Sequence, residues 1–113
     1  MKRFEIWLAD LPKLDNSHIQ CGSRPVVIVS NDAANANSTV ITVVLLTSQR
    51  HKLAMPTHVC LRNQGLERDS IALCEQVMPV DKRRLTRRIG SVYDSFDQLA
   101  LHHALAIQLD MAA

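Results

Sequence analysis

A single arginine lies between a glycine turn and a proline in the segment Gly22-Ser23-Arg24-Pro25, just before the apolar residues 26–29. Gly22 permits a tight backbone bend, and Pro25 restricts Arg24 to extended geometry. A guanidinium held in this way presents a planar fork of donors that stays charged, which suits a phosphate group. From this segment alone a surface ion pair is the favoured interpretation, a phosphate site at Arg24 is the alternative, and the rest of the chain shifts this balance toward the phosphate site.

The cysteines and histidines are not spaced as a metal site. Cys21, Cys60 and Cys74 are widely separated and form no C-x-x-C pair. We therefore expect neither a metal nor a cofactor. Cys60 and Cys74 lie in apolar, strand-like segments, so we expect both to be small buried packing residues. Free thiols in a chain that shows no signal peptide predict a reducing, cytoplasmic location.

The composition predicts one globular domain that spans residues 1–113. Apolar residues make up 47% of the chain and charged residues 21%, which is ordinary for a globular protein. The net charge of +2 is too small to indicate a nucleic-acid binder by itself, so such a site must arise from local clustering. We expect no association with a membrane, because no apolar run approaches the length of a bilayer span.

Short apolar segments separated by turn signals predict five or six strands. The segments are residues 4–8, 24–30, 39–46, 58–61, 70–77 and 88–92. Residues 31–38 are rich in Asn, Asp and Ser and are predicted to form a turn, whereas residues 79–85 are predicted to form a basic connection. Such strands predict a small, strongly bent antiparallel barrel.

The last part of the chain has the period of a helix. Ser95 and Gln98 have the spacing of a capping box, which predicts a helix that runs to about Met111. His102 and His103 fall on its polar side, where we expect them to be solvated. The apolar arc is wider than one contact with a barrel needs, which favours a partner subunit.

Several motifs occur in order along nearly the whole chain. They are residues 5–11 (EIWLADL), 20–28 (QCGSRPVVI), 46–48 (LTS), 56–59 (PTHV), 65–70 (GLERDS), 74–76 (CEQ) and 80–85 (VDKRRL). In this order and at these spacings, they resemble the MazF/PemK/Kid family of toxins from bacterial toxin–antitoxin systems. The resemblance implies a mainly β fold, an SH3-like barrel with a C-terminal helix, assembled as a symmetric homodimer. It also implies a sequence-specific endoribonuclease that cleaves single-stranded mRNA, inhibits translation and is neutralised by a cognate antitoxin with an acidic, partly disordered tail.

The same resemblance implies that Arg24 and Thr47 are the core catalytic pair. RNA cleavage by its own 2′-hydroxyl requires in-line geometry and stabilisation of the charge on the phosphorus-centred transition state. Arg24 can supply the positive charge, while Thr47 and Ser48 can donate hydrogen bonds to phosphate oxygens. The expected products are a 2′,3′-cyclic phosphate and a 5′-hydroxyl end, formed without a metal.

The general base is the uncertain member of this set. Many relatives carry a glutamate where this chain has Ile19, which cannot accept a proton. His18 matches a histidine of the Kid branch and titrates near neutrality, so it is the predicted base, with a solvated loop histidine as the alternative. Glu75 matches a catalytic aspartate of that branch, but Leu73 replaces the accompanying arginine. A structural role for Glu75 and Gln76, tying a strand end to the Arg24 loop, is slightly preferred.

Substrate contacts are expected from the loops around this pair. The predicted substrate-binding residues are Gln20, Gly22, Ser48, Arg50, Lys52, Glu75 and Gln76. The densest basic cluster consists of Lys82, Arg83, Arg84, Arg87 and Arg88, and it could attract an RNA backbone or an acidic antitoxin tail. For any one residue of that cluster, a solvated turn is the simpler interpretation.

Two other functions remain open at this point. A gyrase-poisoning toxin of the CcdB type would share the barrel, but its family ends in a Trp-Gly-Ile-like sequence and this chain ends in residues 109–113, LDMAA. A barrel that binds RNA or antitoxin without cleavage is favoured by Ile19. The barrel fold alone does not separate these functions.

Overall fold

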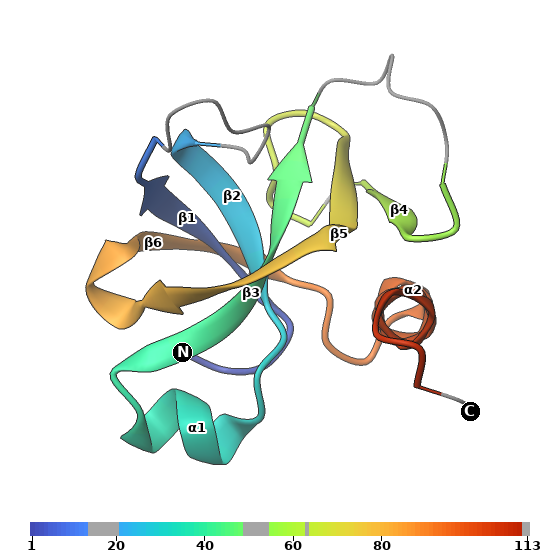
Figure 1. Ribbon diagram of the computed structural model, residues 1–113. Helices are drawn as coiled ribbons and strands as arrows, with labels where there is room; N and C mark the ends of the chain where they lie inside the picture. Colours follow the sequence, from blue (N-terminus) through green and yellow to red (C-terminus); the bar gives the residue numbers. More distant parts are fainter. Residues whose placement is uncertain (14–20, 49–54, 63, 112–113) are drawn as a thin grey trace.

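The computed structural model describes residues 1–13, 21–48, 55–62 and 64–111. Its strands are β1 (Glu5–Leu11), β2 (Gly22–Ile28), β3 (Val40–Thr47), β4 (His58–Leu61), β5 (Ser70–Asp81) and β6 (Leu85–Ser91). Its helices are α1 (Asp32–Asn37), the 3-10 turn η1 (Lys82–Arg84) and α2 (Phe96–Gln108). Within these ranges the strands form one antiparallel sheet in the order β4-β5-β3-β2-β1-β6, which curls into a half-barrel with α2 against one side (Figure 1). The prediction of a mainly β barrel with a C-terminal helix is confirmed.

The two central strands, β2 and β3, are buried on both faces. Successive side chains of a strand point to opposite faces, so Val26 and Val27 enter different cores, and both are 0% exposed. Val27 packs with Val44 in the core beneath α2, whereas Val26 packs with Leu45 in the core on the other face. These strands therefore leave only their ends for contact with a ligand.

Strand β5 runs four residues beyond the predicted strand and includes Pro79. Pro79 lies opposite Thr42 on β3 and has no N–H to donate. Thr42 finds its partners elsewhere: its N–H donates to Ser30 Oγ (3.1 Å), and its carbonyl accepts from the Val29 N–H (2.9 Å). Because Thr42 needs no hydrogen bond from β5, the proline is tolerated inside the strand, and the predicted connection at 79–85 was wrong in its first part.

The predicted turn at residues 31–38 is instead the short helix α1. The reason is helix capping: Asn31 Oδ1 accepts a hydrogen bond from the Ala34 N–H (2.8 Å). An Asn-rich segment can satisfy backbone donors at a helix start as well as in a turn. Sequence composition alone did not separate these two outcomes.

Helix α2 begins as predicted. Ser95 is its N-cap and accepts from the Gln98 N–H (3.3 Å), while Gln98 Oε1 accepts from the Asp94 N–H (2.5 Å) rather than from Ser95. Leu101 and Ala104 are buried against the sheet, whereas Phe96 is 90% exposed and Leu99 67%. The helix therefore presents apolar side chains on two sides, and only one of them is covered by this chain.

The two cysteines predicted to be buried have different environments. Cys74 on β5 is buried, and burial raises the pKa of its thiol to about 12, with a further contribution from the charge of Glu75. Cys60 on β4 is exposed, so the prediction for it was wrong. Its neighbours Val59 and Leu61 point inward, and the alternation of the strand turns Cys60 outward. No helix in the described part of the chain is both long and apolar enough to cross a bilayer.

Two glycines allow the segment before β5 to lie directly against β6. A Cβ atom at Gly90 would overlap the carbonyl oxygen of Gln64, and one at Gly65 would overlap the carbonyl oxygen of Ile89. Gly65 also has a φ of +83°, which disfavours residues with a side chain. This close backbone approach fixes residues 65–70 next to β6.

Candidate active site

The antiparallel pairing of β2 with β3 brings the start of β2 and the end of β3 to the same end of the sheet. The pairs are Ile28 with Val43, Val27 with Val44, and Val26 with Leu45. Arg24 lies two residues before the last pair and Thr47 two residues after it. Because side chains alternate along a strand, both are expected on the face that carries Val26 and Leu45. Beyond Val26 and Leu45 the two strands separate, as the upper ends of β2 and β3 show (Figure 1).

Arg24 is held at the start of β2. Its Nε donates to the carbonyl of Cys21 (3.0 Å), across the turn at Gly22, whose φ is +83°. The backbone of Arg24 lies opposite Ala9 of β1, and its side chain is half-buried. A bond through Nε directs the terminal nitrogens of the guanidinium away from Cys21, as expected of a side chain that binds an anion.

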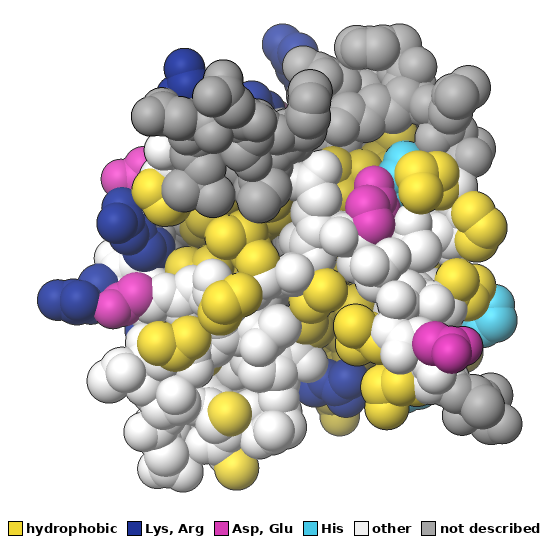
Figure 2. Space-filling view, viewed as in Figure 1, with side chains coloured by type: hydrophobic (Ala, Val, Ile, Leu, Met, Phe, Trp, Pro, Cys, Tyr) yellow, Lys and Arg dark blue, Asp and Glu magenta, His cyan; other side chains and the backbone are white. Residues whose placement is uncertain are grey.

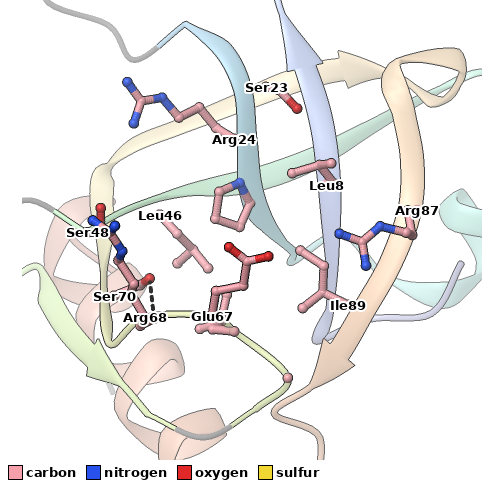
Figure 3. Close-up of a pocket in the computed structure, with 13 residues that line it drawn as sticks. Leu8, Ser23, Arg24, Leu46, Ser48, Glu67, Arg68, Ser70, Arg87 and Ile89 are labelled. Atoms are coloured by element: carbon pink, nitrogen blue, oxygen red, sulfur yellow. Dashed lines mark hydrogen bonds between the residues drawn. The ribbon is translucent and has the colours of Figure 1, made fainter.

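A groove of about 520 Å³ opens beside Arg24 (Figure 3). Its apolar lining residues are Leu8, Pro25, Leu46, Leu66 and Ile89, and its polar lining residues are Ser23, Arg24, Ser48, Gly65, Glu67, Arg68, Ser70 and Arg87. These residues come from β1, β2, the end of β3, the segment before β5, and β6. The groove thus combines an apolar floor with hydroxyl and guanidinium groups at its edges.

Three arginines from three separate segments line this groove: Arg24 from β2, Arg68 from the segment before β5, and Arg87 from β6. Arg68 and Arg87 are both exposed. Guanidinium groups around an apolar floor match a nucleic-acid strand, whose phosphates need positive charge and whose bases need apolar contact.

The basic cluster predicted at residues 82–88 is divided by the fold. Arg87 lines the groove, whereas Arg88 Nε binds Glu5 Oε2 (3.0 Å). Arg83 binds Asp81 through Nε (3.1 Å) and Nη2 (2.9 Å). Acidic and basic side chains accordingly lie next to each other at the left edge of the molecule, beside the turn from β5 to β6 (Figure 2). One member of the cluster therefore faces the groove, while two are engaged by carboxylates.

The hydroxyl groups at the end of β3 differ in accessibility. Ser48 is exposed and lines the groove, whereas Thr47 is 1% exposed. Thr47 thus lies next to the groove without contributing to its surface. A direct contact between its hydroxyl and a ligand requires that the groove opens when the ligand binds.

Glu75 has a structural role, but with other partners than expected. Its Oε1 accepts from Thr57 Oγ1 (2.9 Å), and its Oε2 lies 2.9 Å from His58 Nε2, so it binds the start of β4 rather than the Arg24 loop. Burial alone would raise the pKa of the Glu75 carboxyl. The hydrogen bonds from His58 and Thr57 outweigh burial and hold that pKa below its ordinary value.

Four of the predicted site residues, His18, Gln20, Arg50 and Lys52, lie outside the described residues, as does Ile19. Gly22 is described at the turn before Arg24, and Gln76 lies on β5. In the described part of the chain, no three His, Cys, Asp or Glu side chains are grouped so that they could hold a metal ion.

Sequence reasoning did not select Glu67, Arg68 or Ser70 as site residues, although the motif that contains them was noted. The available signal was a mixed-charge turn, Glu67-Arg68-Asp69, directly after Gly65 and before a strand. A turn with such charges is usually solvated, and only the approach of this segment to β6 places it over the groove.

The chain belongs to the family of PemK-like, MazF-like toxins of type II toxin–antitoxin systems, whose pattern it matches over residues 2–109. Endoribonuclease EndoA of Bacillus subtilis is 40% identical over 96 residues, which cover 83% of this chain and 82% of the relative. The predicted family is confirmed.

Solved structures share the fold. A mycobacterial endoribonuclease in complex with its cognate antitoxin has a TM-score of 0.83 at 23% identity and covers 100% of this chain and 98% of that one. Mycobacterium tuberculosis toxin MazF-mt6 has a TM-score of 0.79 at 24% identity, with 96% and 99% covered. At these identities the similarity shows the barrel with its C-terminal helix, as predicted.

Glu75→Gln tests the role of the carboxylate at β4. Since the folded pKa of Glu75 is lowered, its contribution to stability is present above the unfolded value and is lost as pH falls through the folded value. We expect the variant to lose about 1–2 kcal/mol of unfolding free energy at pH 7. Urea unfolding at pH 7 and at pH 3 measures this, and the difference from wild type should shrink at pH 3. An equal difference at both pH values would contradict the role given to the ionised carboxylate.

Proposed function

We propose that this chain is a toxin that acts as an endoribonuclease on single-stranded RNA, with mRNA as the target, and thereby inhibits translation and growth. The observation that carries the proposal is that Arg24 and Ser48, which follows the end of β3, line one groove together with two further arginines. The chain's membership of a toxin family, and its 40% identity to a relative named Endoribonuclease EndoA, support the same activity.

In the proposed reaction, Arg24 binds the scissile phosphate and stabilises the charge that develops on its oxygens. Thr47 and Ser48 donate hydrogen bonds to the same phosphate, Ser48 from the groove surface and Thr47 after the groove opens. The 2′-hydroxyl attacks in line, and the products are a 2′,3′-cyclic phosphate and a 5′-hydroxyl end. The reaction needs no metal in this scheme. His18, outside the described residues, remains a candidate base.

RNA would lie along the groove with its bases on the apolar floor. Leu8, Pro25 and Leu46 offer surface for bases, and Arg68 and Arg87 offer contacts for phosphates on either side of the scissile one. The predicted contacts from Gln20, Arg50 and Lys52 would extend this path and select the recognised sequence.

The proposed partners are a cognate antitoxin and a second copy of the chain. An antitoxin with an acidic tail would find complementary charge at the arginines of the groove. The apolar side chains on the uncovered side of α2 and near its ends support a symmetric homodimer. Phe96 and Leu99 are the most clearly exposed members of the helix, and Tyr93 before it is 70% exposed. The proposed location is the cytoplasm, where mRNA is translated.

A barrel that binds RNA without cleaving it is the second candidate. Ile19, in place of the glutamate common in the family, and the burial of Thr47 favour it. It differs from the first candidate in one observable only, the appearance of RNA fragments.

Arg24→Ala tests the enzyme. Wild-type protein mixed with a long single-stranded RNA in the presence of a chelator should give discrete fragments with 5′-hydroxyl ends. The variant should cleave at least about 100-fold more slowly, because the positive charge on the transition state is lost. Gel analysis of labelled RNA and end-group analysis measure both results.

The control is a thermal melt of the variant, which should match wild type because Arg24 is only half-buried. Intact RNA with the wild-type protein would contradict the enzyme and support the binding barrel. If RNA stayed intact while DNA supercoiling by gyrase was inhibited, the chain would be a gyrase poison instead.

Arg68→Ala and Arg87→Ala test the RNA path. Each variant should raise KM with little change in kcat, and should reduce the slope of log affinity against log salt by about 0.7, the contribution of one phosphate contact on a single strand. Lys2→Ala removes the same charge from an exposed residue near the N-terminus and outside the groove, and should leave both quantities unchanged. Equal slopes for all four proteins would contradict the proposed path.

A further inference from the structure

The groove contains one carboxylate among its described lining residues, that of Glu67, and no histidine. Glu67 is exposed, and its carboxylate lies over the apolar floor between Leu46 on one side and Ile89 on the other (Figure 3). A carboxylate over an apolar floor, within a groove that otherwise carries positive charge, needs a function that arginine and serine cannot perform.

Cleavage by the 2′-hydroxyl requires a group that accepts its proton. The lining arginines are donors only, and the hydroxyls of Ser23, Ser48 and Ser70 are too weakly basic for this task. Position 19, where many relatives carry a glutamate, holds an isoleucine. Among the described groove residues, Glu67 carries the one carboxylate, which is a side-chain type that serves as a general base.

We propose that Glu67 is the general base of this groove and takes the proton from the attacking 2′-hydroxyl. The inference rests on the proposed endoribonuclease function and names a further catalytic residue for it. It gives a catalytic role to the segment before β5, which belongs to the motif at residues 65–70 and for which the sequence alone indicated no such role.

The backbone around Glu67 is placed firmly enough for this role. On one side, Gly65 lies directly against the carbonyl of Ile89, and Leu66 packs against the core beneath α2. On the other side, Ser70 is 4% exposed and begins β5. Glu67 therefore projects from a segment anchored at both ends.

The other charged groups that line the groove are three arginines from three segments. Arg24 lines the groove from β2 with its guanidinium directed away from Glu67 (Figure 3), Arg87 lines it from β6 and Arg68 from the segment of Glu67 itself, while the described lining residues of β1 and the end of β3, Leu8, Leu46 and Ser48, carry no charge. The arginines can bind phosphates next to the carboxylate, so that the negatively charged RNA and Glu67 occupy the same groove. In this arrangement the arginines bind the phosphates and Glu67 accepts the proton.

The proposed step moves one proton to Glu67 and exchanges one oxygen on phosphorus for another. The 2′-proton moves to a Glu67 carboxylate oxygen, the 2′-oxygen forms a bond to phosphorus, and the bond from phosphorus to the 5′-oxygen breaks. The 5′-oxygen leaves with a proton taken from solvent, and Glu67 later returns the 2′-proton to solvent. Arg24 stabilises the charge on the phosphate oxygens throughout.

Glu67→Gln tests the inference, because glutamine keeps the size of the side chain and loses its basicity. We expect kcat to fall by about 10²–10⁴-fold with KM nearly unchanged. A carboxylate that acts as general base gives a rate that rises with pH in the acid range, and this limb should be present in wild type and absent from the variant. Both quantities come from single-turnover cleavage of a short RNA between pH 4 and pH 8.

Three controls separate this role from a structural one. Glu67→Asp should keep the acid limb at a reduced rate, because a carboxylate remains. Asp110→Asn removes an exposed carboxylate outside the groove, at a residue with a φ of 52° that Asn tolerates, and should behave as wild type. Binding of Glu67→Gln to a 2′-O-methyl RNA, which cannot react, should be within about threefold of wild type and would confirm that the variant is folded.

Two results would overturn the inference while leaving the proposed function intact. In the first, Glu67→Gln keeps the rate and the acid limb, and His18→Ala abolishes the limb, which makes His18 the base. In the second, Glu67→Gln changes the cleaved sequence at full rate, which makes Glu67 a base-reading residue. Failure of the wild-type protein to cleave any RNA would overturn both proposals and is distinct from either result.

Discussion

The register of β2 against β3 is the constraint on which the site depends. Three residue pairs, the last of them Val26 with Leu45, fix how the two strands align, and Arg24 and Thr47 each lie two residues beyond that last pair. Both strands are buried on both faces, so a slip by one residue would exchange the contents of two cores. The same apolar packing that stabilises the barrel therefore sets the position of the arginine backbone, and the bond from its Nε to the Cys21 carbonyl directs the side chain.

Burial on both faces also explains why the groove lies at the strand ends. Between Val26 and Ile28 nothing on β2 is open to solvent, and the groove forms where β2 and β3 separate. Its remaining wall comes from the segment before β5, which Gly65 and Gly90 allow to lie against β6. The sheet register therefore positions the wall formed by the ends of β2 and β3. The close backbone contact with β6 positions the wall formed by the segment before β5.

Much of the fold followed from local patterns in the sequence. Apolar runs marked the strands, Ser95 marked the start of α2, and the arginine between glycine and proline marked the site. The predictions that were wrong depend on contacts between segments distant in the sequence. Pro79 is tolerated in β5 because the Thr42 backbone forms its hydrogen bonds elsewhere, and Glu75 binds the start of β4 rather than the Arg24 loop. Glu67 and Arg68 were missed for the same reason, because their place in the groove depends on contacts with β6 that leave no local signal.

A double-mutant cycle between Arg24 and Thr47 measures the central claim most directly. Arg24→Lys keeps the charge but loses the fork, Thr47→Ala removes the hydroxyl, and kcat/KM is measured for both single variants and the double variant. If both side chains act on one phosphate, the loss in the double variant should fall short of the product of the single losses by at least about tenfold, a coupling of about 1.4 kcal/mol. A loss equal to that product would show that the two residues act independently and would contradict the account.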